Sequence, residues 1–238
     1  MRNFQAIISK TINNSLTQFD RLGYIADNFA NYSTTGYKSV RFEQMLSEEG
    51  YLKGALRTDY SEGSVQITSN PYDIAINGDG FIPVTSSTGE VQYTRDGSLK
   101  VSKDGYLTTN DDWLVGSGIQ IPTNVYKVSI KADGTVTAMD SSKAPERKIG
   151  LIPLVQFRNP EGLKQGDSNK LVPTEESGQA TLVKDHDRIA QYSLEHSNTN
   201  VWNSASEILR LNASMIASMR MAKVIDNMYN KSINLRQS

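Results

Sequence analysis

The stretch that decides the fold of the central part of this chain is Asp73-Ile74-Ala75-Ile76-Asn77-Gly78-Asp79-Gly80-Phe81. An apolar run rich in isoleucine ends at an Asp-Gly pair, which is typical of a strand followed by a tight turn because Asp and Gly tolerate positive φ. The same dipeptide recurs at Asp96-Gly97, Asp104-Gly105 and Asp133-Gly134. Short β-rich runs lie between these turns. We therefore expect a central all-β domain of hairpins, sandwich-like or barrel-like.

The composition changes on both sides of this centre. Residues 1–40 carry four Lys/Arg against two Asp/Glu, and residues 200–238 carry five against two. The part between them is acidic and holds nearly all of the glycine and proline. The sequence therefore predicts three parts. They are terminal helical segments at 1–38 and 199–238, an extended linker at 39–62 and a β-domain at 63–198.

Apolar residues at both ends of the chain recur at alternating steps of three and four. They are Ile8, Ile12, Phe19, Leu22 and Phe29 near the N-terminus, where Ser15 and Ala26 complete the spacing, and Ile208, Leu211, Met215, Ala222 and Ile225 near the C-terminus, where Ser218 completes it. The mean spacing is close to the heptad period of a coiled coil. The sequence therefore predicts an α+β fold in which long N- and C-terminal helices form a coiled coil. Two helices packed on an ordinary core, and ends that are disordered until assembly, are the alternatives.

The overall composition excludes several classes of protein. The 238 residues include no cysteine, so disulfides and thiolate chemistry are excluded. The net charge is −1, which makes nucleic acid a poor choice of partner. No apolar run is long enough to span a membrane, and no apolar segment of a cleavable secretory signal follows the N-terminus.

No arrangement of residues suggests catalysis. The Asn77-to-Gly80 turn lacks the ligand spacing of a calcium loop and the third glycine of a dinucleotide fingerprint. His186 and His196 each stand beside acidic residues in polar stretches, and we interpret both as solvated loop residues. We therefore expect no enzyme activity, no cofactor and no metal.

The segment Asp27–Lys38 resembles the N-terminal signature of the bacterial flagellar rod and hook proteins. The residues that fit the signature are Asn28, Ala30, Asn31, Thr34, Gly36, Tyr37 and Lys38. The stretches 73–81, 93–98 and 197–201 resemble further motifs of this family in the same order. One departure is at Ser218–Lys223, where only Arg220 and Ala222 match the family's glutamine-arginine-alanine-tyrosine-glutamate element.

This resemblance implies a structural subunit of the flagellar basal-body rod. Such a subunit leaves the cell through the flagellar type III export apparatus without a cleaved signal and polymerises into the torque-transmitting shaft across the periplasm. Its partners are copies of itself and other rod and hook proteins, with no nucleic acid and no membrane span. The compact interval between Lys38 and Asp73 favours a proximal-rod protein of the F type. A distal-rod protein of the G type, or another axial protein of the hook and basal body, is the alternative.

Two other classes share some of these features. A secreted β-domain binding module on a helical stalk would have the same three-part layout, and it would remain monomeric and hold a ligand. A hydrolase with an unusual pair of acidic residues is the enzymatic alternative. Self-assembly distinguishes a rod subunit from both.

Overall fold

Residues 2–184 and 187–237 are described by a computed structural model, and they divide into two units. Unit 1 contains the residues up to Tyr32, Ser39–Asp59 and the residues from Thr199 onward. Unit 2 contains Ser33–Lys38 and Tyr60–Asn198. The short segment that follows the first helix therefore belongs to the β-rich unit rather than to the helical one.

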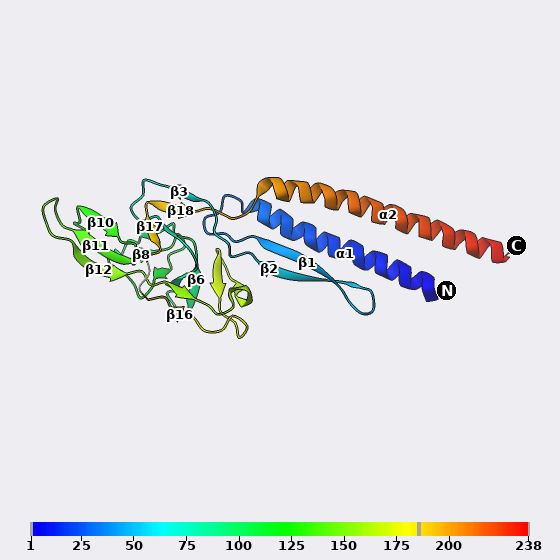
Figure 1. Cartoon of the computed structure of the whole chain (residues 1–238), viewed down its shortest axis with the longest axis horizontal. Helices are drawn as coiled ribbons and strands as arrows, with labels where there is room; N and C mark the ends of the chain where they lie inside the picture. The colour runs from blue at the N-terminus through cyan, green and yellow to red at the C-terminus, as the bar shows by residue number, and fades with distance from the viewer. Residues whose placement is uncertain (1, 185–186, 238) are drawn as a thin grey trace. The chain divides into compact units, whose positions relative to one another are not determined.

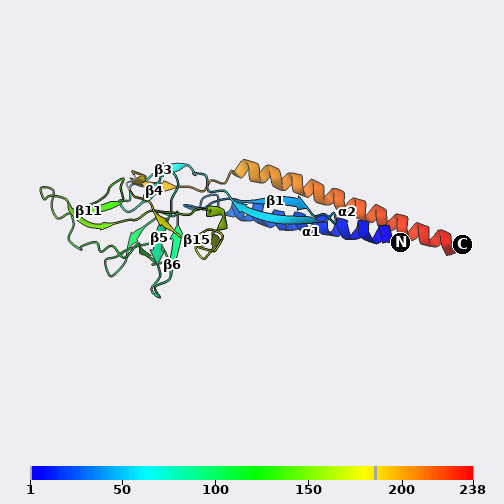
Figure 2. The same ribbon diagram turned by 60° about the horizontal axis from the view of Figure 1, so that its bottom comes forward.

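Unit 1 combines two long helices with a β-hairpin, and these elements run alongside one another (Figure 1; Figure 2). Its elements are α1 (Arg2–Ala30), β1 (Val40–Leu46), β2 (Leu52–Thr58) and α2 (Val201–Gln237). β1 and β2 pair antiparallel in register from Val40↔Thr58 to Leu46↔Leu52. The Phe42 ring stacks on Tyr24 of α1 with a centroid distance of 5.7 Å. The stretch 39–62, expected to be a linker, thus holds a hairpin that packs on α1.

Polar side chains connect α1 to α2. They form an ion pair between Arg21 and Glu207, a 3.0 Å hydrogen bond from Gln18 to Ser214 and a 3.5 Å one from Asn14 to Ser218. By contrast, Ile12 and Phe19 of the expected apolar seam are 54% and 55% exposed. The predicted coiled coil is therefore wrong. Heptad spacing shows that a helix has an apolar face, but it does not specify what covers that face.

Unit 2 contains many short strands. They are β3 (Val65–Ile67), β4 (Ile74–Ile76), β5 (Ile82–Thr85), β6 (Val91–Thr94), β7 (Lys100–Val101), β8 (Leu107–Thr108), β9 (Leu114–Val115), β10 (Lys127–Ile130), β11 (Thr135–Met139), β12 (Arg147–Leu151), β13 (Val155–Gln156), β14 (Lys164–Gln165), β15 (Lys170–Val172), β16 (Thr181–Leu182), β17 (Ile189–Gln191) and β18 (Ser193–Glu195), with a 3-10 turn at Pro160–Gly162. The helices of unit 1 and the strands of unit 2 are consistent with the α+β class.

The largest sheet of unit 2 has the strand order β14-β15-β6-β5-β9-β8-β7, and β10-β11-β12 form a second sheet. The last two strands of unit 2 pair with its first two, because β17 pairs with β4 and β18 pairs with β3. Isoleucine, leucine and valine side chains from these strands form the main core. They include Ile74, Ile76, Ile82, Val84, Leu107, Val115 and Val136. A smaller aromatic cluster includes Phe81 and Phe157.

Two of the expected Asp-Gly turns close hairpins. Gly105 donates its N–H to the Ser102 carbonyl at 3.0 Å, and Gly134 donates to Lys131 at 2.9 Å. Both glycines have φ near +80°, as the Asp-Gly signal requires. Within the described part of the chain, no helix combines the length and apolar character needed to cross a membrane.

Candidate functional site

The residues of the Asp27–Lys38 motif extend from the end of α1 into unit 2. Asn28 and Ala30 lie in the last turn of α1, and Asn31 and Thr34 lie in the turn that follows. Gly36, Tyr37 and Lys38 are buried within unit 2. The motif therefore divides into a helical part and a part that is embedded in the β-rich unit.

Asn28 holds the beginning of β1 against α1. Its Nδ2 donates to the Val40 carbonyl at 2.8 Å, and its Oδ1 accepts from the Val40 N–H, also at 2.8 Å. Asn13 makes the same pair of bonds with Leu52 at the beginning of β2, at 3.1 and 2.7 Å. A primary amide can pair with both backbone groups of one residue because it presents a donor and an acceptor side by side. The two asparagines thus fix both strands of the hairpin to one helix.

Gly36 occupies a position where no side chain fits. Its φ is +66°, and a Cβ there would lie 2.5 Å from the carbonyl carbon of Arg95. Its N–H donates to the Glu195 carbonyl at 2.8 Å. The neighbouring Thr35 hydroxyl donates to Asp96 at 2.7 Å, and Asn169 donates to the Thr35 carbonyl at 2.9 Å. This glycine lets the segment lie directly against the backbone of unit 2.

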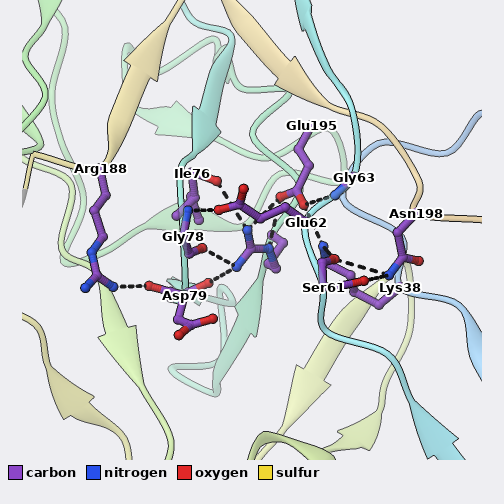
Figure 3. A network of polar contacts seen from close by, with 12 residues as sticks. Lys38, Ser61, Glu62, Gly63, Ile76, Gly78, Asp79, Arg188, Glu195 and Asn198 are labelled. Atoms are coloured by element: carbon purple, nitrogen blue, oxygen red, sulfur yellow. Dashed lines mark hydrogen bonds and ion pairs between the residues drawn. The ribbon is translucent and has the colours of Figure 1, made fainter.

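Lys38, the last residue of the motif, lies beside Glu195 (Figure 3). With Arg95 these two residues form a buried cluster of ions. Lys38 Nζ lies 2.5 Å from Glu195 Oε1 and 2.6 Å from the Ser61 carbonyl oxygen. Arg95 binds Glu195 Oε2 through Nε at 3.0 Å and through its terminal nitrogen at 2.9 Å. The side chains of Lys38, Arg95 and Glu195 are 5%, 3% and 1% exposed. We call these three residues the Glu195 cluster.

Backbone groups complete the Glu195 cluster. Arg95 donates to the Gly78 and Gly80 carbonyls at 3.0 Å and to the Ile76 carbonyl at 3.2 Å. The Gly63 N–H donates to Glu195 Oε1 at 2.9 Å. Buried ions are tolerated only where opposite charges and hydrogen bonds replace water. Two cations face one carboxylate here, so the cluster has an excess of positive charge. The backbone carbonyls that accept from Arg95 and Lys38 are needed to stabilise that excess charge.

Another buried cation in unit 2 is Lys170 on β15. Its ammonium group pairs with Asp111 and lies 4.7 Å from the centre of the Trp113 ring. Partial burial alone would raise the pKa of Asp111, but hydrogen bonds from Lys170 and Thr109 outweigh it and hold this pKa below its usual value. The pair therefore stabilises the ionised form of the carboxyl group.

Sequence reasoning missed both Arg95 and Glu195 as parts of one cluster. Arg95 stands in the stretch 93–98, which the sequence identifies only as a motif of the family. Glu195 stands beside His196 at the end of β18, where an acidic residue is unremarkable. Only the burial of Glu195 beside two distant cations distinguishes it, and no local pattern reports such a pairing.

A family model described as the flagellar hook protein FlgE/F/G D1 domain matches residues 75–138, within unit 2. The flagellar basal-body rod protein FlgF of Mesorhizobium japonicum is 31% identical over 198 residues, which are 76% of this chain and 76% of that protein. The chain belongs to the flagellar basal-body rod protein family. FlgG of Buchnera aphidicola subsp. Schizaphis graminum is also 31% identical over 181 residues, 66% of this chain and 70% of that protein.

Further rod proteins match over more of the chain. FlgG of Caulobacter vibrioides is 26% identical over 241 residues, 89% of this chain and 92% of that protein. Membership of the rod protein family makes the chain a structural subunit of the flagellar basal-body rod. The expectations of a flagellar rod subunit and of a place in the basal body are confirmed.

The apolar residues expected to pack between the helices of this rod protein differ in how deeply they are buried. Leu211 and Met215 are buried in unit 1, and Leu22, Ile208 and Ile225 are partly buried. The remaining positions are exposed. They are Ile8, Ile12, Phe19, Phe29 and Ala222. The described residues thus leave a substantial apolar surface of α1 uncovered.

The histidines and acidic residues add no site to this description. His196 Nε2 lies 2.5 Å from Gln66 Oε1, and His186 lies outside the described residues. In the described ranges, no three His, Asp or Glu residues are arranged to hold a metal ion. The Glu195 cluster can position chain segments, because its charged groups bind one another and the backbone.

Proposed function

We propose that this rod protein polymerises with copies of itself and with other rod and hook proteins through the exposed apolar faces of unit 1. The observation that carries the proposal is the row of exposed apolar side chains on α1. Its members include Ile8, Ile12, Leu16 and Phe19. A monomer gains nothing by leaving such a face in water, whereas a polymer removes it from water at about 25 cal/mol per Å².

The outer surface of α2 supports the same role. Trp202, Leu209 and Ile216 are exposed and recur every seven residues, so they lie along one side of the helix. Contacts between unlike faces of identical subunits generate an open helical filament when the rotation does not close a ring. The two helices of unit 1 therefore offer separate surfaces for such contacts.

Complementation of a deletion strain tests the proposal. Wild-type chain is expected to restore motility and complete rods in electron micrographs of purified basal bodies. Phe19→Asp is expected to fold normally, because Phe19 is exposed, and to leave rods incomplete. Asp20→Asn, at an adjacent exposed position, is the control and should assemble normally. Normal rods from Phe19→Asp would contradict an assembly role for this face.

The position within the rod is a finer proposal. The compact interval between Lys38 and Asp73 supports a proximal position, and matches to FlgG proteins over about nine-tenths of the chain support the distal alternative. The point at which the rod stops in the deletion strain separates them. A proximal subunit should leave a shorter rod stub than a distal one.

Export and the absence of catalysis also belong to the proposal. The family resemblance supports passage through the flagellar type III export apparatus, which retention of the chain in an export-deficient strain would test. No enzyme chemistry is required of a subunit that transmits torque through contacts alone. The binding of Glu195 by Arg95, Lys38 and the backbone supports a mechanical use of this cluster.

A further inference from the structure

The chain passes between the two units at four points along the sequence. They follow Tyr32, Lys38, Asp59 and Asn198. The chain therefore enters or leaves unit 2 through three segments, which are 33–38, 60–63 and 195–198. Any force on the ends of the chain enters unit 2 through these segments.

Within unit 2, Glu195 binds the other two segments. Its Oε1 accepts from Lys38 Nζ at 2.5 Å and from the Gly63 N–H at 2.9 Å. Its backbone carbonyl accepts from the Gly36 N–H at 2.8 Å. The Ser61 carbonyl oxygen adds a second connection, because it accepts from both Lys38 Nζ and Asn198 Nδ2, the latter at 3.2 Å.

The other carboxylate oxygen of Glu195 connects the cluster to the core of unit 2. Oε2 is bound by Arg95, which in turn donates to the carbonyls of Ile76, Gly78 and Gly80. Figure 3 shows Ile76 and Gly78 on the side of this network away from Lys38. Ile76 is the last residue of β4, whose side chains lie in the main core. One carboxylate thus joins three peripheral segments to a core strand.

We propose that Glu195 is the mechanical anchor of unit 2, fastening the segments through which the chain enters and leaves this unit to Arg95 and β4. Pulling segment 33–38 or 195–198 away separates buried opposite charges, and pulling segment 60–63 away breaks hydrogen bonds to them. The low polarity of the surroundings strengthens these attractions. The mechanical part of this inference rests on the proposed function, because only a subunit in a rotating shaft carries such a force. The fastening itself is a property of the folded chain.

Hydrogen exchange on the full-length chain tests the fastening. In Glu195→Gln and in Lys38→Met, the amides of Gly36, Gly63 and His196 are expected to exchange at least about tenfold faster than in the wild type. The amides of Val84 and Val115 in the core sheet should keep their protection. Glu175→Gln, at an exposed carboxylate of the same unit, is the control and should leave all of these rates unchanged.

Two results would overturn the proposal. One is unchanged exchange at Gly36, Gly63 and His196 in both variants. The other is equal acceleration throughout unit 2, which would make the cluster a general source of stability. Lys38→Met keeps the test decisive if Glu195→Gln fails to fold, because it leaves the neutral pair of Arg95 and Glu195 in place. Hydrogen exchange is measured on the isolated chain and needs no rod. Unchanged exchange rates would therefore refute the fastening by Glu195 alone. Normal basal bodies in the deletion strain would instead refute the proposed function.

Discussion

Lys38 Nζ lies 2.5 Å from Glu195 Oε1, although 157 residues separate the two in the sequence. Both side chains are almost completely buried. The contact joins the end of the N-terminal motif to the last strand of unit 2, so the motif is part of the folded β-rich unit. This explains why a glycine and a lysine follow one another so closely in the motif: Gly36 permits the close approach, and Lys38 makes the charged contact.

The first prediction concerns Gly36. Gly36→Ala is expected to lower the free energy of unfolding of unit 2 by about 2–4 kcal/mol, because positive φ and crowding against Arg95 both oppose a Cβ. Gly89→Ala is the matched control: its φ is also positive, at +86°, but nothing lies within 4 Å of its Cβ position. That variant should lose only about 1 kcal/mol. Urea unfolding measures both, and equal losses would refute the steric argument.

A second prediction concerns the glycines of unit 1. Gly23 lies within α1 with open space around its Cβ position, so Gly23→Ala should stabilise the helix by about 0.5–1 kcal/mol. Gly54→Ala on β2 should destabilise the hairpin instead, because its Cβ would lie 2.2 Å from the Phe42 ring. Thermal unfolding followed by circular dichroism distinguishes them. A lower melting temperature for Gly23→Ala would show that this glycine is needed for another reason.

The third prediction compares two leucines of α2. Leu211 is 5% exposed and Leu209 is 70% exposed. Leu211→Asp should destabilise unit 1 by several kcal/mol, about 3 or more, because it places a charge in an apolar contact. Leu209→Asp should change the stability of the monomer by less than about 0.5 kcal/mol, and we expect it to impair rod assembly. Helical circular dichroism of the purified monomers checks the difference, and similar losses in the two variants would contradict it.

The fourth prediction concerns the pH dependence of stability. The folded chain holds the pKa of Asp111 below its unfolded value, so the unfolded state binds a proton more readily in acid. The stabilisation from this carboxylate is therefore present above the unfolded pKa of about 3.9 and is lost as the pH falls through the lowered folded value. Asp111→Asn and Lys170→Met should both lose less stability than the wild type between about pH 5 and pH 2. An unchanged acid profile in both variants would refute the assignment.

The sequence could predict those features that depend on neighbouring residues. The Asp104-Gly105 and Asp133-Gly134 turns follow from local backbone preferences, and the helical ends follow from apolar periodicity and from the scarcity of glycine and proline. The motif around Gly36 was also recognisable. In each of these cases, the information lies within about a dozen residues of the feature it determines.

Other features depend on partners that a local pattern does not name. The apolar spacing of Ile12 and Phe19 was correct as a helix face, yet the inference that α2 covers it was wrong. The hairpin of β1 and β2 was missed, because Asn13 and Asn28 on a helix complete its hydrogen bonds. Glu195 was missed for the same reason, since its role depends on Lys38 and Arg95, far away in sequence.

The pairing of β17 with β4 and of β18 with β3 has a consequence for how unit 2 folds. The core strand β4 cannot pair with β17 until residues near 190 are available. Closing the long loop between these two strands is slow compared with forming a local hairpin. Until then, Arg95 and Lys38 lack the carboxylate that permits their burial, which disfavours early collapse around them. A chain that becomes available from its N-terminus therefore completes unit 2 only after residues near 190 are present, and α2 follows this unit in the described part of the chain.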